Sequence, residues 1–123
     1  MRSSIGKSHD RARIMTDIVA GIVHDVTGVP VEHLRSNACT HQITRARCIF
    51  VGLCEGVVSP ASILAEYLSK NNSMISYYKR AYSEHYVAYK DFRELSDKAD
   101  RVLTDLLTNV NGTFRNVFQK EEQ

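Results

Sequence analysis

Apolar residues recur at steps of three and four positions along most of the chain, the spacing that places them on one face of an α-helix. No stretch sustains the apolar–polar alternation that marks a half-buried strand. The pattern therefore predicts an all-α fold with five to six helices. The predicted helices start near residue 8 or 10, near residue 30, at about residue 42, at residue 60, before Ile75 and at about residue 84.

Glycine and proline mark where several of these helices begin and end. Gly28 and Gly56 follow periodic segments and predict helix C-termini, because glycine readily adopts the left-handed backbone that ends a helix. Ser59 and Pro60 together predict a helix start, with serine as the cap and proline in the first turn. The long last helix is predicted to end near residue 110, where the sequence reads NVNG.

The chain length and charge distribution bound the organisation. A chain of 123 residues suits one domain with a single core. We expect residues 1–123 to form one domain, with its core over about 8–83 and a C-terminal helical extension over about 84–118. The net charge of +2 favours no class of partner, but residues 33–54 and 67–83 contain cations and no acid, whereas acids collect from Glu84 onward.

Cysteine usage and hydropathy bear on the compartment. No apolar run has the length of a membrane span, and the N-terminus has no signal-peptide core, so we expect a cytoplasmic protein. Three cysteines, an odd number, suit a reducing compartment. Cys39, His41, Cys48 and Cys54 match no common zinc-binding spacing, and Cys48 and Cys54 have apolar neighbours. We therefore expect buried free thiols, with no metal and no cofactor.

The fourth and fifth helices, joined by a turn of three to four residues, have the form of a helix-turn-helix. The apolar positions that such a unit buries are Leu64, Ala65, Leu68, Ile75 and Tyr78. The exposed positions around the start of the fifth helix are Lys70, Asn71, Asn72, Ser73, Ser76 and Lys79. Asparagine pairs with adenine, and lysine reaches guanine or phosphate, but the same residues also suit caps on a solvated helical hairpin.

Residues 18–82 resemble the C-terminal duplex-binding domain of the bacterial replication initiator DnaA, an all-α fold of the Trp-repressor type. The stretch VPVEHLRSNACTHQITRARCIFVGLCEG follows that family's order of a short helix, a basic loop, two arginines one residue apart and an apolar helix. In SPASILAEYLSKNNSMISYYKRAY, the family's signature Gly-Arg-Asp-His-Thr-Thr-Val falls on Ser69 to Ile75 without a gap. The resemblance implies binding to duplex DNA.

The resemblance also implies roles for individual residues. Arg45 takes the place of an arginine that enters the minor groove, and Lys70 that of a basic residue beside the DNA. The full predicted DNA-binding set is Arg35, His41, Arg45, Arg47, Lys70, Asn71, Asn72, Ser73, Met74, Ser76 and Lys79. The family's Asp-His-Thr-Thr is Asn-Asn-Ser-Met here, and its arginine-rich loop is RSNACTHQ, so we expect a changed base preference.

Catalysis is not expected. The chain lacks the Gly-x-x-x-x-Gly-Lys-Ser/Thr loop that cradles nucleotide phosphates, so it lacks the initiator's ATPase. It has no serine–histidine–aspartate or paired-carboxylate arrangement that suggests an enzyme. Tyr78, Tyr82, Tyr86 and Tyr89 recur at helical spacing, which favours a half-buried stripe over nucleophiles or base-stacking groups.

The C-terminal helix carries an apolar seam at heptad-like spacing: Phe92, Leu95, Ala99, Val102 and Leu106. Two interpretations remain open. The seam packs onto the chain's own core, or it forms a homodimer through Phe92, Leu95, Val102 and Leu106, which would place two readers on paired half-sites.

Together these observations predict a non-catalytic double-stranded DNA-binding protein of the nucleoid that acts in replication or transcription control. Its basic loop would contact the minor groove and phosphates, and its recognition helix would read the major groove. The alternative is a protein–protein interaction adaptor that uses the same fold and no longer binds DNA.

Overall fold

The computed structural model describes residues 2–55 and 60–122, and their side chains over 11–55 and 60–109. Within these ranges the chain forms six α-helices and no strand, which confirms the predicted all-α fold. The helices are α1 (Arg2–Thr27), α2 (Val31–Arg35), α3 (His41–Glu55), α4 (Ala61–Leu68), α5 (Asn72–Ala88) and α6 (Lys90–Glu122). Over the described residues, no helix combines the length and hydropathy needed to cross a bilayer. Gly56 and Ser59, which predicted a helix end and a helix start, lie outside the described residues.

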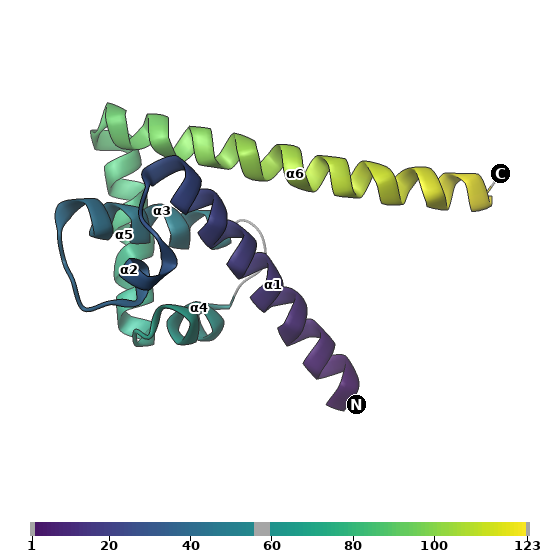
Figure 1. The fold of residues 1–123 in the computed structure, drawn as a ribbon, viewed down its shortest axis with the longest axis horizontal. Helices are drawn as coiled ribbons and strands as arrows, with labels where there is room; N and C mark the ends of the chain where they lie inside the picture. Colours follow the sequence, from purple (N-terminus) through teal and green to yellow (C-terminus); the bar gives the residue numbers. More distant parts are fainter. Residues whose placement is uncertain (1, 56–59, 123) are drawn as a thin grey trace.

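The helices pack around α3, which crosses α5 near the middle of the molecule (Figure 1). α1 packs against α3, α4 and α6, and α4 packs against α5. The short α2 lies against α3. α6 starts beside the end of α5, runs back past α3 and α1, and continues well beyond the other helices (Figure 1).

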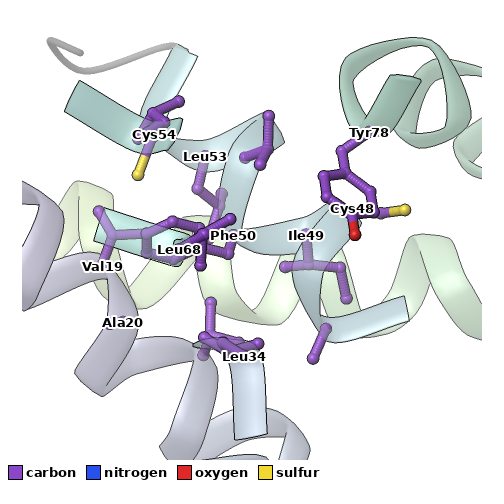
Figure 2. Close-up of a cluster of buried hydrophobic side chains, with 14 of the residues drawn as sticks. Val19, Ala20, Leu34, Cys48, Ile49, Phe50, Leu53, Cys54, Leu68 and Tyr78 are labelled. Atoms are coloured by element: carbon purple, nitrogen blue, oxygen red, sulfur yellow. The ribbon is translucent and has the colours of Figure 1, made fainter. Parts of the chain in front are cut away.

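The core lies where α1, α2, α3 and α4 meet. Phe50, Ile49, Leu34 and Leu68 are fully buried there, and Figure 2 shows them gathered around α3 with Val19 of α1. The five residues predicted to be buried in the helix-turn-helix are at most 7% exposed, so that prediction is confirmed.

Two of the three cysteines belong to the core, as predicted. Cys48 and Cys54 are buried free thiols, whereas Cys39 is exposed. Burial raises the pKa of the Cys48 thiol to about 11 because the low-dielectric interior disfavours the thiolate. The same burial raises the pKa of Cys54 further. Both thiols are therefore neutral packing groups at physiological pH.

Gly52 lies on α3 directly against the ring of Tyr82 on α5. A Cβ atom on Gly52 would lie 2.5 Å from Cδ2 of the Tyr82 ring, so no other residue fits there without moving Tyr82. Tyr82 in turn shares a 2.7 Å hydrogen bond with Ser96 and packs edge-on against Phe92, both on α6. The absence of a side chain at Gly52 thus lets one tyrosine connect three helices.

Three predicted helix boundaries differ from the structure. α1 begins at Arg2 and α6 continues to Glu122, because capping and glycine residues within a helical stretch weaken a helix without necessarily ending it. α5 continues without a break to Ala88, whereas the sequence predicted that a new helix starts near Glu84. Tyr89 breaks the helix with extended backbone angles (φ −122°, ψ 116°). The break lets α6 fold back so that Phe92 packs against Tyr82 and His85.

The predicted dimer seam on α6 is split between the core and the surface. Phe92 is 1% exposed and Ala99 is fully buried, so these residues pack within the chain. The prediction that Phe92 is available to a second copy is therefore wrong. Val102 and Leu106 remain 44% and 40% exposed, and Leu95 is half-buried.

Candidate nucleic-acid interface

α4 and α5 are joined by residues 69–71, a turn of the predicted length. Ser69 has the left-handed conformation that ends a helix, with φ 56° and ψ 43°. The Lys70 amide donates to the Ala65 carbonyl at 2.9 Å, and the Ser69 amide donates to the Glu66 carbonyl at 3.2 Å. These bonds give partners to the Ala65 and Glu66 carbonyls at the end of α4 and turn the backbone toward the start of α5.

Asn71 caps the N-terminus of α5. Its side-chain oxygen accepts a 2.9 Å hydrogen bond from the Met74 amide, and its backbone is extended. The first turn of α5 contains no acid that would repel a phosphate. The helix therefore presents a positive dipole end to solvent beside Asn72 and Ser73, which are both exposed.

The exposed face of α5 continues in helical steps from Ser73 to Ser76 and Arg80, which are all exposed. Lys79, one of the predicted contacts, is half-buried on the flank of this face. Met74 is half-buried and packs against the core, so its side chain serves packing as well as any surface contact.

Arg47 is not a surface cation, and its predicted place among the DNA-binding residues is wrong. The residue is 1% exposed, and its guanidinium donates hydrogen bonds of 2.6–3.2 Å to backbone carbonyls of the α2–α3 region. The four acceptors are the carbonyls of His33, Leu34, Ser36 and Ala38. Because all three guanidinium nitrogens donate to backbone carbonyls and the side chain is 1% exposed, Arg47 holds the loop in place and has no access to DNA.

Lys70 holds the same loop from the side of the helix-turn-helix. Its ammonium nitrogen donates a 2.7 Å hydrogen bond to the Ser36 carbonyl, which also accepts one from Arg47 at 2.6 Å. This shared oxygen fixes the loop over residues 36–40 beside the start of α5. Asn37, Cys39 and Thr40 of the loop are exposed there.

Arg35 is the last residue of α2, and its side chain contacts Tyr67 near the C-terminal end of α4. Its Nε donates a 2.8 Å hydrogen bond to the Tyr67 carbonyl, and its guanidinium stacks 4.6 Å from the centre of the Tyr67 ring. The Tyr67 hydroxyl donates to Asp17 at 2.7 Å. Burial, followed by this hydrogen bond, raises the pKa of Tyr67. Arg35 remains exposed, so it presents a fixed positive charge near the turn.

Arg45 and His41 lie apart from the turn, near the opposite end of α5. They line a cleft of about 310 Å³ together with His85, Tyr89, Asp91 and Phe92. Arg45 forms a 2.9 Å ion pair with Asp91. The helical rise of 1.5 Å per residue separates Asn72 from His85 by about 20 Å. The predicted contacts therefore fall into two groups, one around the turn and one around this cleft.

Arg80 and Tyr77 are exposed residues of α5 outside the predicted set. Tyr77 is 48% exposed, and the Arg80 side chain forms no ion pair with another described residue. The sequence signal for Arg80 was its position four residues after Ser76 and seven after Ser73.

Among the described residues, no three histidine, cysteine, aspartate or glutamate side chains gather closely enough to hold a metal ion. No protein-family model matches the chain, and neither a curated protein nor a solved structure matches it. The resemblance to the DnaA domain rests on the sequence stretches alone and stays a prediction.

Proposed function

We propose that this chain binds duplex DNA through α4, the turn and α5, with the N-terminal half of α5 in the major groove. The observation that carries the proposal is the exposed line of Ser73, Ser76 and Arg80 on a helix whose start is capped by Asn71. The surrounding stretch, residues 67–83, contains no acid. Such a protein would act on the nucleoid in the cytoplasm.

The exposed side chains suit a division between reading bases and holding phosphates. Asn72 has the amide group that pairs with adenine, and Arg80 has the fork that pairs with guanine or phosphate. With α5 in the groove, Arg35 and the loop over residues 36–40 would face the neighbouring sugar–phosphate backbone of the duplex. Arg45 would contribute only where its ion pair with Asp91 opens, so it is a secondary contact.

The proposal can be tested by fluorescence-anisotropy titration of the chain against a pool of random duplexes and the box of the DnaA family at two salt concentrations. A protein that touches about four phosphates should give a log–log salt slope of roughly −4. Arg80→Ala should weaken binding to every duplex and make the slope shallower by about 1. Asn72→Ala should weaken binding only to the preferred sequences.

Arg101→Ala is the matched control, because Arg101 is an exposed arginine on α6 and away from the turn. It should leave affinity and slope close to those of the parent chain. Equal losses in Arg80→Ala and Arg101→Ala would mean that α5 is not the contact surface. No binding at low salt would reject the proposal.

A protein-interaction adaptor is the second candidate, and two observations favour it. The loop that is basic in the DnaA family exposes Asn37, Ala38, Cys39 and Thr40, with no cation among them. Val87, at 78% exposure, and Tyr89, at 55%, place apolar surface at the α5–α6 corner. An adaptor would show no salt-dependent affinity for duplexes in the same titration.

A further inference from the structure

α6 has more apolar surface than its own body covers. Phe92, Ala99 and Leu103 are at most 3% exposed against the rest of the chain. Val102 and Leu106, on the edge of the same face, are 44% and 40% exposed. The covered surface therefore ends while the apolar face continues, which leaves a strip of α6 open to a partner.

The sequence beyond this strip is poor in charge. The stretch over residues 106–119, LLTNVNGTFRNVFQ, contains one charged residue, whereas KDFRELSDKADRVLTD over residues 90–105 contains nine. Val110, Phe114 and Val117 continue the three- and four-residue steps that start at Ala99 and Leu103. This part of α6 extends past the other helices (Figure 1).

Intrinsic propensity does not explain a helix in this stretch. Asparagine, threonine, valine and glycine are weak helix formers, and most helical stability in proteins comes from packing of an apolar face. A helix of 33 residues is about 50 Å long, and its later part extends past the other helices (Figure 1). A surface from another molecule would stabilise this part of the helix.

We propose that a second copy of the chain supplies this surface, with the two α6 helices antiparallel and centred near Val102. The charges beside the exposed strip favour a second copy of the chain as the partner. Lys98 precedes Val102 by four residues and Asp105 follows it by three, so the two lie on the same edge of the helix seven residues apart. In an antiparallel pair, Lys98 of each copy lies near Asp105 of the other, and opposite charges meet at both ends of the contact.

This pairing also brings the weakly charged stretch after Leu106 beside the partner. With the crossing near Val102, positions 107–113 of one copy run beside positions 91–97 of α6 in the other copy. The contact is isologous, so it closes at two copies and does not propagate into a fibre.

The test measures the mass of the full-length chain by sedimentation equilibrium over a range of concentrations, without DNA. The wild-type chain should approach twice its 13.9 kDa mass. The double variant Val102→Glu, Leu106→Glu should raise the dissociation constant of the dimer by more than about 100-fold, because it buries four carboxylates in the contact. Both positions are already exposed in one copy, so circular dichroism should show that the six-helix body still folds.

Val87→Glu is the matched control, since Val87 is a more exposed valine on α5. It should leave the dissociation constant unchanged. Lys98→Glu should weaken the dimer several-fold, and adding Asp105→Lys should restore it, because the charge pair between copies is then reversed but intact. A single-chain mass at all concentrations would overturn the proposal, as would an unaffected Val102→Glu, Leu106→Glu variant. Failure of the charge reversal to restore the dimer would overturn the antiparallel arrangement. None of these outcomes depends on whether the chain binds DNA.

Discussion

The end of the molecule that carries the loop over residues 36–40 and the corner where α5 meets α6 each contain one arginine of α3. The two arginines have opposite surroundings. Arg47 reaches the loop end and is enclosed by four backbone carbonyls. Arg45, two residues earlier on α3, reaches the corner and pairs with Asp91, whose side chain is 74% exposed. Two residues along a helix turn the side chain by about 200°, so neighbouring charges can face the interior and the surface. The number of charged residues in a sequence segment therefore does not give the number of charges that the surface presents to a partner.

The two arrangements also differ in what they contribute to stability. A buried guanidinium is tolerable only because each of its nitrogens has a partner, and its removal takes from the Leu34 and Ala38 carbonyls the side-chain donor that they have here. An ion pair in which one side chain is mostly exposed is weakened by water and salt. We therefore expect substitutions at the loop end to affect folding and substitutions at the corner to leave it nearly intact.

The largest effect is expected for Arg47→Ala. It removes the donors to four carbonyls and leaves a cavity under the loop, so the free energy of unfolding should fall by about 3–5 kcal/mol. Urea titration followed by circular dichroism measures this change. Arg47→Lys keeps the charge but has fewer donors, and it should lose less. A change below about 1 kcal/mol in Arg47→Ala would mean that the carbonyls find water instead.

A smaller effect is expected at the start of α5, where Asn71 and Asn72 are adjacent exposed asparagines. Asn71→Ala removes the side-chain bond to the Met74 amide and should cost about 1 kcal/mol of stability. Asn72→Ala removes no hydrogen bond that its side chain makes to a described residue and should change stability by less than about 0.5 kcal/mol. Thermal unfolding of the two variants separates a cap from a free surface amide. Equal losses would contradict the assignment of Asn71 as the cap.

The smallest effect is expected at the corner. Arg45→Ala should lower the free energy of unfolding by less than about 1 kcal/mol, and Asp91→Asn should behave alike. High salt should abolish the difference between each variant and the parent chain, because it screens the exposed pair. The comparison of the two arginines fails if Arg45→Ala destabilises the chain as much as Arg47→Ala in the same urea titration.

The sequence was sufficient for the helices and most of the core because apolar spacing reports directly on which face of a helix is buried. The cap at Asn71 and the buried thiols Cys48 and Cys54 also followed from local rules. The break at Tyr89 did not, since nothing local ends the helix there. It depends on the packing of Phe92 against Tyr82 and His85, which lie up to ten residues away.

The sequence predicts a surface charge at Arg47 because arginine is rarely buried, and the structure shows that this prediction is wrong. Ile43 lies four residues before it and Phe50 three residues after it, and both are buried on the same face of α3. That position on an apolar stripe was the available signal that Arg47 points inward. Its acceptors are carbonyls from another segment, which no spacing rule identifies. The division of the predicted contacts between the turn and the cleft likewise depends on how α3 crosses α5.

The hydrogen bonds that Arg47 and Lys70 donate to the loop end on backbone carbonyls, and every amino acid supplies one. The identities of Asn37 and Ala38, which are exposed, can therefore change without removing one of these bonds, whereas the Thr40 hydroxyl accepts a 3.3 Å hydrogen bond from the Ile43 amide at the start of α3. Mutation can alter what this loop presents to a partner while its backbone path is retained. The loop is accordingly the place to randomise in a library that seeks new binding preferences from this fold.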